Sequence, residues 1–449
     1  MPLELAGLTA EDLLAMDLTE LPGLDDLHRP LGVIAHAQEL AAAAYGATRS
    51  FFLVNGSTVG IHALLLAIRD DGKILIPRHC HRSVLGGLIL SGAEPVYMRP
   101  LVLEGFGFAA GVSLRQITEA LAENRDIAAV LTVRPNYYGV ADDLSGQVQA
   151  AHGAGKPLVV DEAHGAHLRF HPQMPSDAMS CGADAAVQSA HKMSAALTQS
   201  AMLHLNRGMI DVQAVAVALD LLQTTSPSYL LMASLDLARR RMVLSGASGL
   251  EAALDLVRKT KRRLSQISGL KVLTEEYLPD GWSLDETKIT VAVDGLGLTG
   301  YQVSELLARR YRIYIEMADQ VNIMAVLSPA SKPEECDALA AALEDIAHRD
   351  RMQLGNNLVL MELAPPEPVV RLKPRDAWYA SAENVPLDTS KGRICAESVS
   401  VYPPGIPALC PGEEITPAVL EYLLAAGKLN LICHGPSDPM LKTIRVVVE

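Results

Sequence analysis

Short apolar runs alternate with helical stretches between about residues 48 and 190, and this alternation constrains the fold more than any other feature of the chain. It predicts β-strands at residues 50–54, 73–76, 94–98, 128–133, 158–160 and 185–188. Strands that alternate with helices at this spacing indicate a mostly parallel sheet covered on both faces. Such sheets bind ligands beyond the carboxyl ends of their strands, so the residues that follow each strand are the candidates for a site.

The rest of the chain indicates further domains. A second pattern of alternating strands and helices spans about residues 268–360, and a proline-rich segment follows it. A length of 449 residues also favours two or three domains over one. We predict an N-terminal segment (1–30), a large domain (31–250), a smaller α/β domain (251–363) and a C-terminal lobe (364–449).

Composition and charge exclude some classes of function. A formal charge of −14 argues against nucleic acid as a partner, because its phosphates repel an acidic surface. No run approaches the ~20 apolar residues of a membrane span, and the N-terminus lacks the features of a signal peptide. The six cysteines are scattered without metal-binding spacing, which is typical of reduced thiols. We therefore expect a cytoplasmic protein that does not contact membranes.

Lys192 is the first candidate for chemistry. It follows the strand predicted at residues 185–188, with Ser189 and His191 close before it and small or apolar residues around it. Loss of solvation would favour the neutral amine that a nucleophilic lysine needs. The alternative is an ordinary solvated surface charge, the common state of a lysine.

Asp161 is the second candidate, because its carboxylate should emerge where the apolar run KPLVV ends. A buried carboxylate there can hold a proton on the ring nitrogen of a bound cofactor. The alternatives are a helix N-cap and a metal ligand. His164 and His167 are three residues apart, but we find no third ligand at suitable spacing and predict no metal site.

Two further segments follow predicted strands. In NGST, Gly56 permits a turn, while Ser57 and Thr58 supply hydroxyl and N–H groups at a helix start, a combination that binds phosphate. The same residue types also cap helices that bind nothing. In HCHRS, His79 and His81 are either polar loop residues or, if the other candidates lie nearby, part of one site.

These segments occur in the chain order of the aspartate-aminotransferase fold, and the chain resembles the Orn/Lys/Arg decarboxylase family, major class I. The resemblance covers nearly the whole chain. The chain lacks the large N-terminal wing domain of the long members of the family and is similar to the short, biosynthetic branch. The blocks that carry it are FFLVNGSTVGIHA, RHCHRSVLGGLIL, DEAHGAHLRFHP, GADAAVQSAHKMSAALTQSAMLH, QTTSPSYLLMASLD and VYPPGIPALCPGEEIT.

The resemblance implies a pyridoxal 5'-phosphate (PLP) enzyme of fold type I. Its large domain would hold a mostly parallel seven-stranded sheet, with the active site at the interface of a homodimer or higher homo-oligomer. The catalytic residues would be Lys192, which links covalently to the cofactor, Asp161, His81 and His191. Cofactor contacts are implied for Ser57, Thr58, His81, Asp161, Ala163, His164, Ser189, His191 and Lys192, and across the dimer for Thr225 and Ser226.

Two positions depart from the family pattern, and both affect the expected substrate contacts. Asn136 stands in RPNYYG where we expect threonine, and His79 stands where we expect asparagine. Neither change removes a charge that the reaction needs.

The expected reaction is decarboxylation of a basic amino acid, with Lys192 or His191 returning a proton to Cα. Glu397 is the preferred contact for the distal cation, followed by Asp25 and Asp26, although each could instead be a surface or capping carboxylate. Arginine is favoured over lysine and ornithine, because a guanidinium pairs well with a carboxylate. An aminotransferase or aldolase of the same fold is the main alternative, and a non-catalytic regulator is a weaker one because both Lys192 and Asp161 are present.

Overall fold

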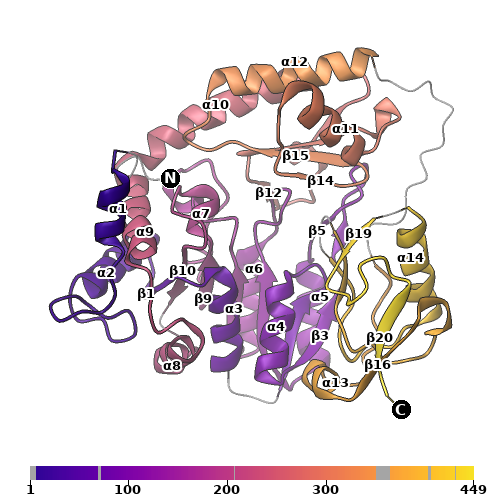
Figure 1. Ribbon diagram of the computed structural model, residues 1–449, viewed down its shortest axis with the longest axis horizontal. Helices are drawn as coiled ribbons and strands as arrows, with labels where there is room; N and C mark the ends of the chain where they lie inside the picture. Colours follow the sequence, from indigo (N-terminus) through magenta and orange to yellow (C-terminus); the bar gives the residue numbers. More distant parts are fainter. Residues whose placement is uncertain are drawn as a thin grey trace. The chain divides into compact units, whose positions relative to one another are not determined.

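Figure 1 shows the structure, a computed structural model. The chain forms two compact units, and the predicted boundary at residues 363 and 364 lies outside the described residues. The first unit comprises Met1–Met98, Val112–Asn136 and Ala141–Ser248, and the second comprises Arg99–Gly111, Tyr137–Val140 and Gly249–Glu449. The structure describes residues 7–68, 72–206, 208–349, 365–402, 406–429 and 431–448.

The first unit contains the sheet predicted from the alternating pattern. Its strands are β1 (Arg49–Leu53), β2 (Lys73–Pro77), β3 (Glu94–Met98), β6 (Ile127–Val133), β8 (Leu158–Asp161), β9 (Ala185–Gln188) and β10 (Ala201–Leu205). Its helices are α1 (Ala10–Met16), α2 (Val33–Tyr45), α3 (Gly56–Ala67), α4 (Arg82–Ser91), α5 (Leu114–Glu123), α6 (Leu144–Gly153), α7 (Ala190–Met193), α8 (Val212–Leu222) and α9 (Tyr229–Arg241), with short turns at Leu168–Phe170 and Met242–Gly246.

The seven strands lie in the order β1-β10-β9-β8-β6-β2-β3. Neighbours from β9 to β3 are parallel, whereas β10 runs antiparallel to both β9 and β1. The expectation of a mostly parallel seven-stranded sheet is confirmed. Because β1 and β9 are both antiparallel to β10, β1 shares the direction of the parallel strands, and its carboxyl end meets theirs at one edge.

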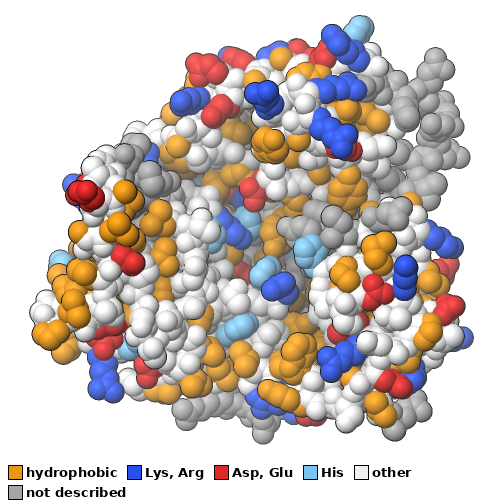
Figure 2. Space-filling model, in the orientation of Figure 1, with side chains coloured by type: hydrophobic (Ala, Val, Ile, Leu, Met, Phe, Trp, Pro, Cys, Tyr) orange, Lys and Arg blue, Asp and Glu red, His pale blue; other side chains and the backbone are white. Residues whose placement is uncertain are grey.

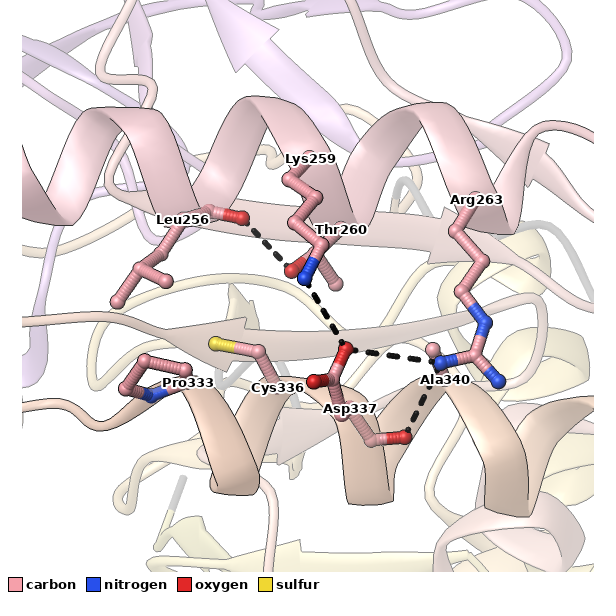
Figure 3. A pocket seen from close by; sticks show the side chains of 8 residues that line it. All are labelled: Leu256, Lys259, Thr260, Arg263, Pro333, Cys336, Asp337 and Ala340. Atoms are coloured by element: carbon pink, nitrogen blue, oxygen red, sulfur yellow. Dashed lines mark hydrogen bonds and ion pairs between the residues drawn. The ribbon is translucent and has the colours of Figure 1, made fainter.

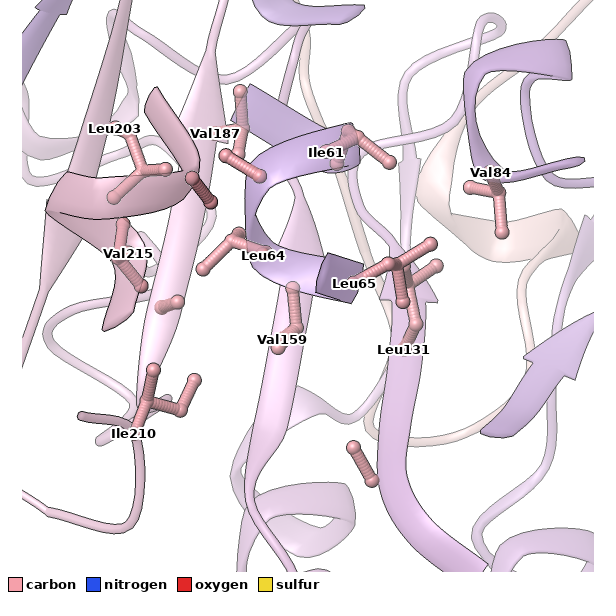
Figure 4. Packing of buried hydrophobic residues seen from close by; sticks show 14 of the residues in the cluster. Ile61, Leu64, Leu65, Val84, Leu131, Val159, Val187, Leu203, Ile210 and Val215 are labelled. Atoms are coloured by element: carbon pink, nitrogen blue, oxygen red, sulfur yellow. The ribbon is translucent and has the colours of Figure 1, made fainter. Parts of the chain in front are cut away.

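Helices cover both faces of this sheet, as the apolar strands require. On β8, Val159 packs with residues of α3, α4 and α8, while Leu158 and Val160 pack on the other face with residues of α5 and α6. Figure 4 shows the first of these cores, where Leu64 and Leu65 of α3 lie against strand residues such as Val187 and Leu131. The parallel strands are therefore buried on both sides.

Gly60 explains how closely α3 approaches the sheet. A Cβ atom at this position would lie 2.8 Å from side-chain carbons of both Leu53 and Val187. Glycine removes that clash, so the helix can lie directly on β1 and β9. The start of α3 is thereby held at the carboxyl edge of the sheet.

The second unit contains five small sheets within the described residues, among them β11-β13-β15-β14 and β18-β17-β19. One core joins α10 and α12 to β13 and β15, and another packs α14 against β17 and β18. Its elements are β4 (Leu101–Val102), β5 (Ala109–Gly111), β7 (Val140–Ala141), α10 (Ala247–Leu264), β11 (Lys271–Val272), β12 (Ser283–Leu284), β13 (Lys288–Ala292), α11 (Gly300–Leu306), β14 (Met317–Ala318), β15 (Asn322–Val326), α12 (Pro333–Arg349), α13 (Pro374–Tyr379), β16 (Ala382–Pro386), β17 (Val399–Tyr402), β18 (Ile406–Leu409), α14 (Pro417–Lys428), β19 (Ile432–His434) and β20 (Thr443–Val447). In the part of the chain that the structure describes, no helix combines the length and apolar character needed to cross a bilayer.

Candidate active site at the carboxyl edge of the sheet

The polar residues that the sequence singles out lie at or just after the ends of four strands of the first unit. Ser57 follows β1, His81 follows β2, Asp161 is the last residue of β8, and Ser189 directly follows β9. Since these strands all point the same way, their ends meet at one edge of the sheet. The fold thus gathers residues that lie far apart in the sequence.

Hydroxyl and amide groups converge at the start of α3. Ser189 Oγ donates a hydrogen bond to Ser57 Oγ across 3.0 Å, which joins the end of β9 to the first turn of the helix. Gly56 begins the helix with φ of 77°, a backbone conformation that favours glycine. The N-cap residue, Asn55, makes no side-chain cap bond, and Thr58 is exposed in the first turn. Two hydroxyls beside the N–H groups of a helix start form a suitable cradle for a phosphate group.

Asp161 is a buried carboxylate, with only 5% of its surface exposed. Its Oδ1 accepts a hydrogen bond from the Ala163 N–H at 3.2 Å, and its backbone carbonyl accepts one from the Arg134 N–H at 3.0 Å. The second bond ties the end of β8 to the residue that follows β6. A fixed, buried negative charge at this edge can hold a proton on a nitrogen of a bound ring.

His81 caps α4, since its Nδ1 accepts a hydrogen bond from the Ser83 N–H. Burial lowers the pKa of His81, while the carboxylate of Asp161 raises that pKa and the cation of Lys192 lowers it. These electrostatic contributions show that His81, Asp161 and Lys192 lie close enough to influence one another. The lowered pKa favours a neutral imidazole at neutral pH, which suits a ring that stacks on a flat cofactor.

Lys192 lies on the short helix α7, directly beyond β9. Its side chain is exposed, so the expectation that its surroundings desolvate it is wrong for this chain. The reason is that α7 buries Ala190 and Met193 but turns Lys192 outward. Lys192 Nζ lies 2.9 Å from Nε2 of the buried His164, and this contact holds the amine at the strand-end edge.

The two histidines near Lys192 differ in their partners. His191 Nδ1 lies 3.2 Å from the Ser200 carbonyl, and burial lowers the pKa of His191. His164, which the sequence placed among the cofactor contacts, is the histidine that meets the lysine amine. The DEAH motif alone did not predict this contact, because it depends on how the turn after β8 folds back over α7.

The loop with Thr225 and Ser226 lies beside the end of β1. The Val54 N–H donates to Gln223 Oε1 at 2.9 Å, and the Thr224 N–H donates to Asn55 Oδ1 at 3.2 Å. Thr225 and Ser226 are exposed, as a contact with a partner subunit would require. That contact stays a prediction.

The carboxylates predicted to bind the substrate have structural partners. Glu397, in the second unit, accepts hydrogen bonds from the Ser437 N–H at 2.7 Å and the Arg445 N–H at 2.9 Å. Asp25 accepts four hydrogen bonds from the N–H groups of Leu31, Gly32, Ile34 and Ala35 at the start of α2. Asp26 accepts one from the His28 N–H at 2.7 Å. The capping role left open for these residues is thus present for Asp25, whereas Glu397 and Asp26 bind backbone N–H groups away from a helix start, and the role of all three toward a substrate stays a prediction.

Both positions that depart from the family pattern are buried. Asn136 lies just beyond β6, and His79 lies just beyond β2. Burial lowers the pKa of His79 to about 4, so its imidazole is neutral at neutral pH. Neither residue adds a charge to the edge of the sheet.

Other candidate sites have less support. Among the described residues, no group of three or more His, Cys, Asp or Glu side chains could hold a metal ion. A cavity of about 50 Å³ lies between α10 and α12 in the second unit (Figure 3). Small-molecule sites usually measure ~300 Å³ or more. The two cations that line the cavity, Lys259 and Arg263, both pair with Asp337, so they already have an anionic partner.

Comparisons with known proteins agree with this geometry. Residues 6–335 match the family described as Orn/Lys/Arg decarboxylase, major domain, and residues 359–435 match its C-terminal domain. The chain is 40% identical to the arginine decarboxylase of Bacillus subtilis, with 98% of this chain and 90% of that protein covered. It is 39% identical to the arginine decarboxylase of Bacillus anthracis, with 97% and 89% covered. Among solved structures, lysine decarboxylase A from Pseudomonas aeruginosa superposes with a TM-score of 0.85 at 22% identity, covering 98% of this chain and 75% of that chain.

Proposed function

This chain belongs to the Orn/Lys/Arg decarboxylase family, and from that premise we propose that it is a PLP-dependent carboxy-lyase that converts arginine to agmatine. The observation that carries the choice of arginine is the similarity, over nearly the full length, to proteins named arginine decarboxylase. Lysine and ornithine are the alternative substrates, since the same site chemistry serves all three. Agmatine is a polyamine precursor, which suits a biosynthetic role.

The residues at the carboxyl edge fit the cofactor. Ser57 and Ser189, with the first N–H groups of α3, would hold its phosphate, because they combine hydroxyl donors with a helix N-terminus. Thr58 would add a hydroxyl, and Ala163 would pack against the ring. The chemistry that bound PLP supplies is an electron sink for the bond between the substrate's Cα and its carboxylate.

Three side chains would carry the chemistry around that ring. Asp161 holds a proton on the ring nitrogen, because a buried carboxylate stabilises a neighbouring positive charge. His81 lies on the same edge, and its imidazole, whose pKa burial lowers, would pack as a neutral ring against the cofactor. Lys192 would provide the amine that holds the cofactor covalently.

We assign the exchange of protons with Lys192 to His164. Its Nε2 lies 2.9 Å from the lysine amine, within the reach that a general base or acid needs. His191 is the other candidate for returning the proton to Cα, but its Nδ1 contacts the Ser200 carbonyl. The pair of His164 and Lys192 is therefore the better supported route for that proton.

A substrate panel tests the reaction and the choice of substrate. Arginine is expected to release carbon dioxide and yield agmatine with kcat/KM at least about tenfold above lysine and ornithine, because a bidentate pair with a carboxylate gains ~1.4 kcal/mol or more over a single contact. The measurement is carbon dioxide release together with identification of the amine. A higher kcat/KM for lysine would show that lysine is the substrate. Formation of a keto acid without release of carbon dioxide would show that the protein is an aminotransferase.

We also propose that the enzyme is a homodimer. Leu24, Leu31, Val33 and Leu221 are 42%, 93%, 73% and 76% exposed. His28, between Leu24 and Leu31 in the sequence, joins their segment to α8, since its Nδ1 lies 3.2 Å from Asp220 Oδ1. Figure 2 shows hydrophobic side chains gathered over the part of this face where Figure 1 draws α1 and α2. Exposed apolar side chains that gather on one face mark an interface.

Two charges on that surface are expected to separate the dimer. Leu31→Asp combined with Leu221→Asp should weaken dimerisation by roughly 10²-fold, since each change would bury an unpaired carboxylate. Light scattering after size exclusion measures the change in mass with concentration. Met440→Asp, at a position that is 66% exposed in the second unit, is the matched control. A double variant that stays dimeric at all concentrations would place the interface elsewhere.

The cysteines support a cytoplasmic location, which we propose on that ground. None of the six is in a disulfide, and five of them are buried. Reduced thiols are usual in the cytosol, where thioredoxin and glutathione keep them so. A buried thiol such as Cys395, whose pKa burial raises, is also poorly reactive.

A further inference from the structure

A line of buried polar side chains crosses four neighbouring strands of the large sheet, next to the candidate active site. Ser50 Oγ lies 2.7 Å from His204 Nδ1, and His204 Nε2 lies 3.2 Å from Gln188 Oε1. Gln188 Nε2 donates to Glu162 Oε2 at 2.7 Å, and the Ala178 N–H donates to Glu162 Oε1 at 2.8 Å. All four side chains are at most 1% exposed, so their hydrogen bonds are made within the protein.

Two residues of this line are neighbours in the sequence of residues in the candidate site. Glu162 directly follows Asp161, and Gln188 directly precedes Ser189. Successive side chains of an extended chain point to opposite faces, so the line lies behind the face that presents Asp161 and Ser189. Consistent with this, Val159 and Val187 pack in one core, whereas Val160 and Ala186 pack in another.

The line is uncharged at neutral pH. Burial, together with the neighbouring carboxylate of Asp177, raises the pKa of Glu162 to about 8, against the opposing effects of hydrogen bonds from Gln188 and Ala178 and of the charge of Arg134. Burial lowers the pKa of His204 to about 3, and Tyr45 stacks on its ring at 4.5 Å. The other titratable groups that interact with Glu162 are Tyr45 and Cys181.

One proton on Glu162 would set the direction of every bond in the line. With that proton in place, the Gln188 side-chain amide turns over from the orientation given above, so that Glu162 Oε2 donates to Gln188 Oε1 and Gln188 Nε2 donates to His204 Nε2. His204 must carry its hydrogen on Nδ1, which donates to Ser50 Oγ. Hydrogen bonds that point the same way reinforce one another, so the four strands are held in one arrangement.

We propose that Glu162, with Gln188 and His204, is a positioning residue that fixes the ends of β8 and β9 and thereby the places of Asp161 and Ser189. The inference rests on the proposed function, because those two residues matter only if they hold the cofactor. A rigid support behind a site keeps its contacts within the small tolerance that binding needs. Glu162 makes no contact with the reacting atoms in this scheme and acts only through its neighbours.

The test compares Glu162→Gln with Glu162→Leu. Glutamine keeps an acceptor for the Ala178 N–H and a donor for the side-chain oxygen of Gln188. The Glu162→Gln variant should therefore bind PLP with an affinity within about threefold of the wild type. Leucine removes both bonds and should weaken PLP binding by roughly tenfold or more. The dissociation constant is measured from absorbance as PLP is added to the chain. Equal affinities in all three proteins would leave Glu162 a purely structural residue and overturn the proposal.

The dependence of unfolding on pH gives a second, independent measurement on the chain without added PLP. The pKa of Glu162 is about 8 in the folded chain, whereas the ordinary pKa of a glutamate is 4.5. The folded chain therefore binds this proton more tightly than the unfolded chain does, and the stability that results is lost as the pH rises from 4.5 to about 8. Glu162→Gln cannot ionise, so its unfolding temperature should gain on the wild type by roughly 5 °C between pH 5 and pH 8. If the unfolding temperatures of the two proteins change in parallel with pH, Glu162 does not carry a proton in the folded chain.

The two measurements separate the inference from the proposed function. A wild-type chain that fails to bind PLP would sink the proposed function, while the comparison of unfolding curves would still report on the proton of Glu162. A wild-type chain that binds PLP, with variants that bind it equally well, would overturn the positioning role alone.

Discussion

Lys192→Ala is expected to lower the rate of arginine decarboxylation by about 10³-fold or more, the largest effect predicted for any single change. The lysine supplies both the amine that links to the cofactor and a group that exchanges protons, and either role alone is worth ~10²–10⁴-fold. The fold should survive, because Lys192 is exposed and substitutions at exposed positions usually change stability by ~0.5 kcal/mol or less. The loss can therefore be read as chemistry.

A second measurement on the same variant does not depend on turnover. Borohydride should fix PLP to the wild-type chain as a mass increase on the peptide that contains Lys192, and this increase should be absent from Lys192→Ala. Lys391→Ala, at an exposed lysine of the second unit, is the matched control and should keep both activity and the mass increase. A cofactor absorbance band and reducible link that persist without Lys192 would show that another amine serves.

The sheet and the placing of its site could be predicted from the sequence because one physical rule connects them. A parallel strand buried on both faces is a short apolar run, and β8 and β9 are such runs. Once those runs are taken as strands, Asp161 and Ser189 must emerge at the same edge. The hydrogen bond between Ser189 and Ser57 confirms that β1 ends there as well.

The place of β10 could not be predicted in the same way. Its sequence, AMLHL, is apolar on both sides of one histidine and continues a stretch rich in alanine, so it does not differ from a helical segment of that length. It becomes a strand because it fits between β1 and β9, where His204 forms hydrogen bonds with Ser50 Oγ and Gln188 Oε1. Ser50 lies 154 positions from His204, so no local pattern indicates this pairing.

The surroundings of Lys192 show a second limit of the sequence. Small and apolar neighbours indicated a desolvated amine, but burial depends on which way a single helical turn faces, and α7 is only four residues long. The same uncertainty hid the contact with His164, which the spacing of DEAH cannot specify. Glu397 illustrates the reverse case, since its backbone partners Ser437 and Arg445 are 40 and 48 positions away and no local pattern reveals them.

Asp161→Asn is expected to lower kcat by roughly 10²–10³-fold while the fold is retained. Asparagine matches the shape of aspartate and keeps an oxygen for the Ala163 N–H, so the change removes little besides the charge. That charge is what holds the proton on the cofactor's ring nitrogen, and a buried ion pair of this kind is worth ~3–5 kcal/mol when one partner is lost. Asp184→Asn is the matched control, because Asp184 is also buried but accepts its hydrogen bonds from His152 and the Leu158 N–H at the opposite end of the sheet. If both variants lose activity equally, the effect belongs to the fold; if Asp161→Asn alone loses it while still binding PLP, the carboxylate acts on the ring.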